Sequence, residues 1–329
     1  MDRIDTNNLR KVSIVDCPVI GKGKCGSVYK LSEDKIIKQF NSFISEDDVL
    51  AEYVCSLNAS KVFEKTAKVY ELVKLDDGYG IIYECLNGDD LEKFFIKNPE
   101  MIKEYSKEMG ILLKQMHRAD ISGVEIKRAK DEFNNRLKYA KDYIISLSDE
   151  DTYKKILSIL DNIPDKEIYL HGDYHADNIL MINGVMRPID MADNMVGHPV
   201  FDFLITYALR VRLYDCFEYV LASLKNYTGD DKDKLEKVFN REKEVAYSPE
   251  KSKIFWNSFI RGYLNTDDEE KIQKVTEAAK YFSALHLVTA KRSESFLGEY
   301  MTKIFTKLGI ENLMAEYNSF DMSILDSML

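Results

Sequence analysis

One short stretch of the sequence carries acids and an amide at a spacing that suits chemistry on phosphates. It runs from His171 to Asn178 as His-Gly-Asp-Tyr-His-Ala-Asp-Asn, and another aspartate follows at Asp190. Asp173 could accept or orient a hydroxyl proton, whereas Asn178 and Asp190 offer oxygen atoms, which Mg²⁺ takes together with substrate phosphates. A base and two metal ligands are what phosphoryl transfer requires of a protein. We therefore predict these roles, and a polar loop with capping acids is the alternative.

Three glycines, Gly21, Gly23 and Gly26, form a second candidate for binding phosphates. They lie in the sequence Gly-Lys-Gly-Lys-Cys-Gly-Ser-Val, and glycines let backbone amides approach phosphate oxygens without intervening side chains. In a dinucleotide-binding fold the third glycine leads into a helix, whereas residues 27–31 continue here as a predicted strand. A glycine loop between two strands is typical of kinases. A plain glycine hairpin is the alternative.

A lysine on the next predicted strand could reach the phosphates of a bound nucleotide. Lys38 lies in the run Ile-Ile-Lys-Gln-Phe beyond the glycine loop, and an acid on the neighbouring helix would have to hold it in place. Glu52 is the natural partner, while Lys30 and Glu46 are rival choices for the pair. A solvated charge on an edge strand is the alternative for any single lysine.

Residues 84–86 join the strand-rich part of the sequence to the rest. In a two-lobed nucleotide site the connecting strand offers backbone N–H and C=O groups to the adenine ring. We therefore predict that Glu84 and Leu86 contact the base. An ordinary strand end explains the same local pattern equally well.

Two regions of different character must position these residues. Strand-like runs cover residues 12–20, 27–31, 35–40, 67–75 and 79–86, with one helix that begins at Ser45, a typical N-cap. From Asn98-Pro99 onward, apolar residues at spacings of three and four predict helices, with a β island at residues 168–189 that turns at Asn183-Gly184. We predict an α+β fold with a nucleotide-binding lobe at 1–87 and a helical lobe at 88–329, which holds the catalytic loop and substrate site.

The composition indicates a globular protein with an acidic surface. The 329 residues include 46 Lys and Arg against 56 Asp and Glu, a net charge of −10. This balance argues against nucleic acid as a partner, because phosphate contacts supply most of that affinity, and it fits a cationic substrate better. No apolar run approaches the roughly 20 residues that span a bilayer, and no signal-peptide core is present. Five scattered cysteines indicate reduced thiols and a cytoplasmic location.

These motifs resemble those of the aminoglycoside phosphotransferase and choline kinase superfamily, which shares the bilobal protein-kinase-like fold. The HGD motif with an asparagine five residues after its aspartate corresponds to residues 171–178, and the later Ile-Asp and GDPxxD motifs correspond to residues 189–190 and 197–202. The resemblance implies that Asp173 is similar to the catalytic base and that Asn178 and Asp190 are similar to the magnesium ligands. It extends to about residue 210.

The resemblance also assigns supporting residues and shows departures from the family pattern. It implies that Lys38 contacts phosphate while paired with Glu52, and that Asp202 braces the catalytic loop without touching substrate. His198 replaces the aspartate of GDPxxD. Only eleven residues separate Asp190 from Asp202, which leaves no room for an activation segment and makes protein substrates less favoured than small ones.

We therefore expect an ATP- and Mg²⁺-dependent kinase that phosphorylates a hydroxyl group of an aminoglycoside, of choline or ethanolamine, or of a sugar-like compound. Choline would need an aromatic cage, for which Trp256, Tyr247 and Tyr263 are candidates, whereas an aminoglycoside would need several carboxylates. A protein kinase without an activation segment and a non-catalytic nucleotide-binding regulator are the alternative functions. The sequence leaves the oligomeric state open.

Overall fold

The computed structural model describes residues 5–23, 25–229, 232–245 and 248–328, and in it the chain forms two compact units. The first unit comprises Met1–Phe94, Ala119–Ile126 and Ala176–Asn194, and the second comprises Phe95–Arg118, Lys127–His175 and Met195–Leu329. The first unit therefore contains the lobe expected at residues 1–87 together with most of the expected β island. Asp173 belongs to the second unit, whereas Asn178 and Asp190 belong to the first.

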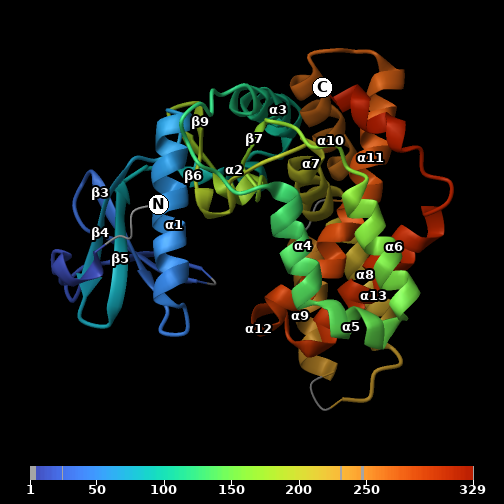
Figure 1. Cartoon of the computed structure of the whole chain (residues 1–329), viewed down its shortest axis with the longest axis horizontal. Helices are drawn as coiled ribbons and strands as arrows, with labels where there is room; N and C mark the ends of the chain where they lie inside the picture. The colour runs from blue at the N-terminus through green and yellow to red at the C-terminus, as the bar shows by residue number, and fades with distance from the viewer. Residues whose placement is uncertain (1–4, 24, 230–231, 246–247, 329) are drawn as a thin grey trace. The chain divides into compact units, whose positions relative to one another are not determined.

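A five-stranded antiparallel sheet and one long helix form the main body of the first unit (Figure 1). The strand order is β1-β2-β3-β5-β4, with β1 Val19–Lys22, β2 Gly26–Lys30, β3 Lys35–Phe40, β4 Val69–Leu75 and β5 Gly78–Glu84. Helix α1, Glu46–Val62, begins as expected at Ser45, whose hydroxyl oxygen accepts the N–H of Asp48. Side chains from the helix and the sheet bury one cluster made of Phe40, Val49, Leu72 and Ile81.

A smaller antiparallel sheet completes the first unit. Its order is β6-β8-β9, with β6 Asp89–Asp90, β8 Ile179–Ile182 and β9 Val185–Pro188. Asn183 and Gly184 form the two-residue turn between β8 and β9, and both have positive φ angles, 50° and 80°. Asn-Gly is the favoured pair for such a turn because both residues adopt left-handed backbone at low cost. The predicted hairpin is therefore present.

The strand expected over residues 12–20 is shorter in the structure. Only its last two residues belong to β1, Val19–Lys22. Before them the N–H of Cys17 donates to the carbonyl of Ile14 at 3.0 Å, which closes a turn. Pro18 follows this turn and has no backbone N–H to give to a neighbouring strand. The turn and the proline together delay the start of the strand.

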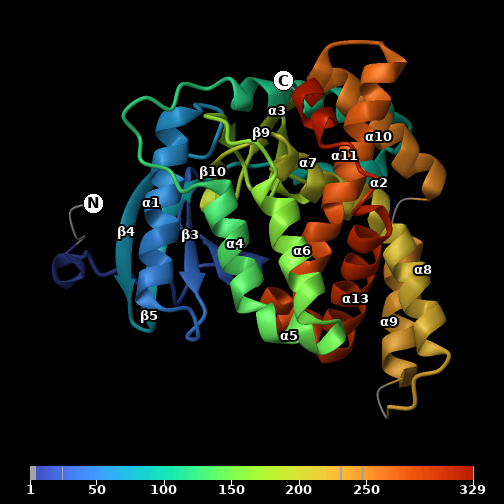
Figure 2. The same cartoon turned by 45° about the vertical axis from the view of Figure 1, so that its right-hand side comes forward.

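The second unit is mainly helical (Figure 2). Its helices are α3 Ile102–His117, α4 Ala129–Tyr139, α5 Lys141–Leu147, α6 Glu150–Asp161, α7 Val200–Tyr207, α8 Leu213–Leu224, α9 Lys232–Val245, α10 Pro249–Leu264, α11 Glu269–Val288, α12 Glu294–Leu297 and α13 Glu299–Glu316, while α2 Leu91–Lys97 crosses the boundary between the units. The helix expected at Asn98-Pro99 starts with a 3₁₀ turn, Pro99–Met101, and becomes α-helical at Ile102.

Two segments of the second unit hold the loop that contains Asp173. The short strands β7 Tyr169–Leu170 and β10 Met195–Val196 pair antiparallel, and β7 leads directly into that loop. Helix α7 follows β10 and is buried along its whole length. A π-helical turn, Ala208–Arg212, continues from α7.

No helix among the described residues is both long enough and apolar enough to cross a membrane.

Candidate active site

The three glycines of the predicted phosphate loop differ in what the fold requires of them. A Cβ atom added to Gly26 would lie 2.0 Å from the carbonyl oxygen of Gln39 on β3, so this position must be glycine for the strands to pair. At Gly21 the nearest atom would be 3.6 Å away, and at Gly23 it would be 3.9 Å away. None of the three has a positive φ. The fold therefore requires glycine at position 26, whereas Gly21 and Gly23 have room for a side chain.

Lys38 on β3 and Glu52 on α1 form the ion pair that the sequence suggested. Nζ of Lys38 lies 2.6 Å from Oε1 of Glu52, and the two side chains are 18% and 12% exposed. The hydroxyl of Tyr83 on β5 also donates to Glu52, at 3.3 Å. Burial alone would lower the pKa of Lys38, but the negative charges of Asp190 and Glu52 outweigh it and raise that pKa. Lys38 is therefore a fixed cation within the field of the predicted metal ligand Asp190.

The predicted metal ligands Asn178 and Asp190 lie at the same end of the β8–β9 hairpin. Asn178 ends a 3₁₀ turn before β8, and its backbone carbonyl accepts the N–H of Ile189 at 2.9 Å. Asp190 comes directly after Ile189 and has a left-handed backbone, with φ 57° and ψ 59°. Residues opposite each other in such a pairing have Cα atoms about 5 Å apart. The hairpin therefore brings the backbones of Asn178 and Asp190, which are twelve residues apart in the sequence, close together.

The two oxygen donors of this hairpin suit Mg²⁺, whose remaining ligands can be phosphates and waters. They do not suit a metal ion that takes all its ligands from the protein. Among the described residues, no group of three or more His, Cys, Asp or Glu side chains is placed to hold a metal ion. Mg²⁺ is usually bound through one or two carboxylates, with substrate phosphates and waters completing its shell. Asp190 and Asn178 would hold Mg²⁺ in that way.

A side chain that the sequence did not single out, Arg187, ties this hairpin to the end of β5. Its guanidinium group donates to both carboxylate oxygens of Glu84, at 3.1 and 2.9 Å, and to the carbonyls of Lys65 and Thr66, at 3.0 and 2.9 Å. These partners are more than 100 residues away in the sequence, so no local pattern reveals the contact. The contact fixes the position of β9, and hence of Asp190, relative to β5.

The backbone at the end of β5 restricts which predicted residues can contact adenine. The N–H of Glu84 donates to the carbonyl of Lys68 at 2.8 Å, and the N–H of Cys85 donates to the carbonyl of Asp34 at 2.8 Å. In the described part of the chain the N–H of Leu86 makes no backbone hydrogen bond. Of the two predicted contacts, Leu86 therefore keeps its backbone N–H available for a base. The N–H of Glu84 is already used, and its carboxylate binds Arg187.

In the second unit, buried Asp202 braces the loop that presents Asp173. Its Oδ1 accepts the N–H of Gly172 at 2.7 Å, and its Oδ2 accepts the N–H of His171 at 2.9 Å and Nε2–H of His117 at 3.0 Å. The N–H of Asp173 in turn donates to Nδ1 of His171 at 3.3 Å. Asp202 thus has the supporting role that the resemblance implied, and His171 supports the same loop. Asp173 itself keeps 36% of its side chain exposed.

Three histidines act on the charge of Asp173. Nε2 of His175 lies 3.5 Å from its carboxylate. Burial would raise the pKa of Asp173, but the hydrogen bond and charge of His175, with smaller contributions from His171 and His286, hold it well below its usual value. His286 on α11 also experiences the charges of Arg136 and Arg292, and burial lowers the pKa of this histidine to about 4. Asp173 is therefore ionised at neutral pH, in surroundings that are neutral to positive.

His198, which stands where the family pattern has aspartate, fits its buried position as a neutral side chain. Its Nδ1 accepts the N–H of Val200 at 3.1 Å, at the start of α7, and its Nε2–H donates to the carbonyl of Leu325 at 3.2 Å. Burial lowers the pKa of His198 to about 4. Both ring nitrogens are satisfied, so the departure from the family pattern leaves no unpaired group.

Two of the three aromatic residues considered for an ammonium cage belong to the core. Trp256 and Tyr263 are 2% and 1% exposed, and both pack edge-on against Phe203. Nε1 of Trp256 donates to Thr276, and the hydroxyl of Tyr263 bonds to Nδ1 of His117. Tyr247 lies outside the described residues. The two described rings therefore have structural roles.

The small antiparallel sheet with one helix, followed by a mainly helical unit, is the architecture that the sequence predicted for a kinase-like fold. The chain belongs to the phosphotransferase enzyme family, whose model matches residues 30–235, more than half of its length. No curated protein sequence matches the chain significantly.

Solved structures of a choline/ethanolamine kinase family protein and of aminoglycoside phosphotransferases share the fold at low sequence identity. A choline/ethanolamine kinase family protein from Mesorhizobium loti is 13% identical, with a TM-score of 0.56 over 95% of this chain and 92% of that one. The ADP-bound aminoglycoside phosphotransferase APH(2'')-Ib is 14% identical, with a TM-score of 0.54 over 91% and 95%. The gentamicin complex of APH(2'')-IIa is 15% identical, with a TM-score of 0.52 over 97% and 93%. The predicted superfamily and α+β fold class are therefore confirmed.

Proposed function

We propose that the protein transfers the γ-phosphoryl group of ATP to a hydroxyl group of a small molecule. The observation that carries the proposal is the grouping of Lys38, Glu52 and Asp190 in the first unit. Lys38 is held 2.6 Å from Glu52 and lies within the field of Asp190, the predicted metal ligand. A phosphate-binding lysine, its helix acid and a metal aspartate are the parts that phosphoryl transfer needs on the nucleotide side. The solved relatives bound to ADP and to ATP support ATP as the donor.

Each residue of the first unit has a defined task in this proposal. Lys38 binds the phosphates, the backbone at Gly21 and Gly23, which carries no side chain, lets them approach closely, and the backbone of Leu86 contacts adenine. Asn178 and Asp190 hold Mg²⁺, which when bound neutralises charge on the transferring group.

Asp173 of the second unit orients the acceptor hydroxyl and takes its proton. Because its pKa lies below the usual value, Asp173 is a weak base. Such a base accepts the proton late, after bonding to phosphorus has made the hydroxyl more acidic. Its main contribution is therefore to fix the hydroxyl in the direction of attack.

The chain between Asp190 and α7 supports a small acceptor rather than a protein. After Asp190 a 3₁₀ turn, Met191–Asp193, leads into β10, and α7 begins at Val200. No described residue is left over for an activation segment of the kind that protein kinases place here. A protein acceptor would lack the surface on which such kinases dock it.

The charges near Asp173 favour a neutral or acidic acceptor. His175, His171 and His286 are the charged groups with the largest effect on Asp173. An aminoglycoside is cationic and would need several carboxylates at this place. The overall net charge of −10 had favoured such a cationic substrate. For the choice of acceptor, the charges near Asp173 matter more than the net charge of the protein, because salt screens distant charges.

The experiment that tests the proposal is release of ADP from Mg-ATP in the presence of candidate acceptors. The panel should contain simple sugars and hydroxy acids besides aminoglycosides, choline and ethanolamine. With an accepted substrate, Asp173→Asn should lower kcat by about 100-fold or more while Mg-ATP affinity stays unchanged. Asp190→Ala should weaken Mg-ATP binding in calorimetry. Nucleotide binding without turnover on any acceptor would favour the regulator hypothesis, and full turnover by Asp173→Asn would refute its role.

A further inference from the structure

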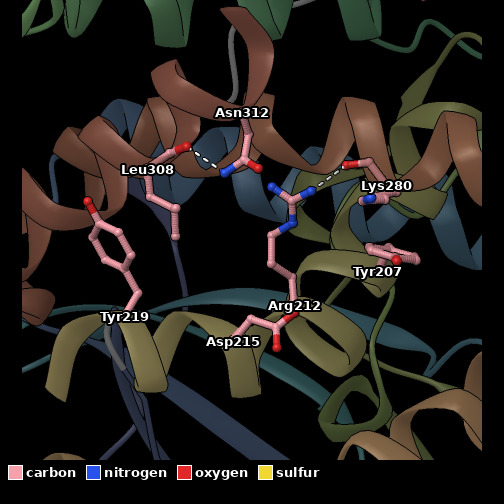
Figure 3. Close-up of a pocket in the computed structure, with 7 residues that line it drawn as sticks. All are labelled: Tyr207, Arg212, Asp215, Tyr219, Lys280, Leu308 and Asn312. Atoms are coloured by element: carbon pink, nitrogen blue, oxygen red, sulfur yellow. Dashed lines mark hydrogen bonds between the residues drawn. The ribbon is translucent and has the colours of Figure 1, made fainter. Parts of the chain in front are cut away.

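A cavity in the second unit is lined by side chains from five helical segments (Figure 3). The cavity has a volume of about 230 Å³, is partly open to solvent, and lies between α7, the π-helical turn, α8, α11 and α13. This volume is below the roughly 300–1,000 Å³ of typical ligand pockets, so the cavity suits a small ligand or one group of a larger one. The lining residues are Tyr207, Arg212, Asp215, Tyr219, Lys280, Leu308 and Asn312.

Arg212 is the unusual member of this set, because its charge is buried without an ion pair. The residue is only 7% exposed. Its Nη2 donates to the backbone carbonyl of Lys280 at 2.8 Å, whereas its Nη1 has no hydrogen-bond partner among the described residues. Asp215 and Glu316 act on the guanidinium charge only from beyond ion-pair distance. A buried charge without a partner lowers stability, so such groups are uncommon unless a ligand pairs with them.

The backbone that carries Arg212 is itself unusual. Residues Ala208–Arg212 form a π-helical turn between α7 and α8. Such turns are rare and are found frequently at functional sites. The turn places Arg212 with its guanidinium group beside Asn312 and the backbone of Lys280 (Figure 3).

We propose that this cavity binds a small molecule through one carboxylate or phosphate group, which pairs with the guanidinium group of Arg212. Arg212 and Lys280 supply two positive charges to the lining, and Asp215 supplies one negative charge. The excess of one positive charge fits a ligand with a single anionic group. Arg212 can donate hydrogen bonds to such a group. A guanidinium has five N–H donors, and the N–H groups on Nη1 of Arg212 make no hydrogen bond among the described residues. The phenol rings of Tyr207 and Tyr219 offer apolar surface to the rest of the ligand.

The cavity is distinct from the surroundings of Asp173. Lys280 and His286, which acts on Asp173, both belong to α11 but are six residues apart. Six residues correspond to about 9 Å along the helix axis and a rotation of about 240°. The cavity therefore faces another side of α11. Tyr207 in its wall directly follows Thr206, whose hydroxyl donates to the carbonyl of Tyr174 at 2.6 Å, so the wall connects to the Asp173 loop.

Calorimetric titration of the whole protein with two probes, inorganic phosphate and malonate, tests the proposal. ADP should be saturating, so that the nucleotide site is filled in every titration. We expect Arg212→Met to weaken binding of the preferred probe by about 10-fold or more, equivalent to about 1.4 kcal/mol. Arg212→Lys, which keeps the charge, should weaken it less. The preferred probe would tell whether the ligand group is a phosphate or a carboxylate.

Arg261→Met is the matched control, because it removes an arginine of the same unit that is already paired with Asp267 and Glu269. It should bind the probes like the wild type, and anions bound elsewhere should contribute equally to all variants. Arg212→Met should also melt no lower than the wild type, since it removes an unpaired buried charge. Equal binding by Arg212→Met and Arg261→Met, or no binding by the wild type, would overturn the proposal.

Discussion

Replacement of Asp202 by asparagine should separate the support of the Asp173 loop from the chemistry at Asp173. The Asp202 carboxylate is fully buried and accepts three hydrogen bonds, from the backbone N–H groups of His171 and Gly172 and from His117. Asparagine keeps the shape but turns one of the two acceptor oxygens into a donor. If its oxygen takes the place of Oδ2, its NH₂ group faces the N–H of Gly172.

The expected loss of stability follows from these contacts. A hydrogen bond to a charged group contributes about 1.5–3 kcal/mol, and a buried donor left unsatisfied costs about 1–3 kcal/mol more. We therefore expect Asp202→Asn to lower the free energy of unfolding by about 3–5 kcal/mol, as when a buried pair loses one partner. The displaced loop should also lower kcat.

Urea unfolding followed by circular dichroism measures this loss, with Asp173→Asn as the matched control. Asp173 has 36% of its side chain exposed and lies 3.5 Å from His175, so its replacement should cost less than about 1 kcal/mol. The control should thus be stable and inactive, whereas Asp202→Asn should be unstable. If Asp202→Asn unfolded within about 1 kcal/mol of the wild type and kept its kcat, the three hydrogen bonds would not support the loop as argued.

Three further changes test other parts of the structure. Lys38→Ala should lower kcat/KM by about 100-fold or more, and Lys30→Ala should have little effect in the same steady-state assay; the reverse order would mean that another lysine binds the phosphates. Arg187→Met should destabilise the first unit by about 3 kcal/mol in urea unfolding, because it leaves Glu84 without its partner, and an unchanged midpoint would contradict this. His198 has a pKa of about 4 when folded and an ordinary value of 6.5, so the unfolded chain binds its proton at higher pH. Its contribution of about 3 kcal/mol to the free energy of unfolding should be present above pH 6.5 and lost towards pH 4. In urea unfolding, His198→Gln should lose less stability than the wild type over that pH range.

The sequence predicted best those features that depend on neighbouring residues. Ser45 caps α1, and Asn183 with Gly184 forms the turn between β8 and β9, because cap and turn chemistry acts within a few residues. Strand β3 covers residues 35–40 as expected. The expected strand at residues 12–20 was wrong for most of its length, because a turn closed at Cys17 outweighed the apolar pattern.

The features that the sequence could not predict depend on residues that are distant in the chain. Arg187 binds Glu84, Lys65 and Thr66, and nothing near Arg187 distinguishes it from any other basic residue on a strand. The burial of Arg212 likewise depends on the π-helical turn and on Lys280, which is 68 residues away. Such contacts come from tertiary packing, which overrides the local preference of each segment.

The glycine loop shows why one sequence pattern can have two physical causes. Gly26 is required because the backbone of β3 leaves no room for a Cβ atom, and this requirement would hold in a protein that binds nothing. Gly21 and Gly23 have room for a side chain and no positive φ, so packing gives no reason for them. A plain glycine hairpin, the alternative to a phosphate loop, explains only Gly26. Gly21 lies on β1, in the same sheet as Lys38, and Gly23 directly follows that strand, so both positions leave room for a phosphate to approach the backbone beside Lys38.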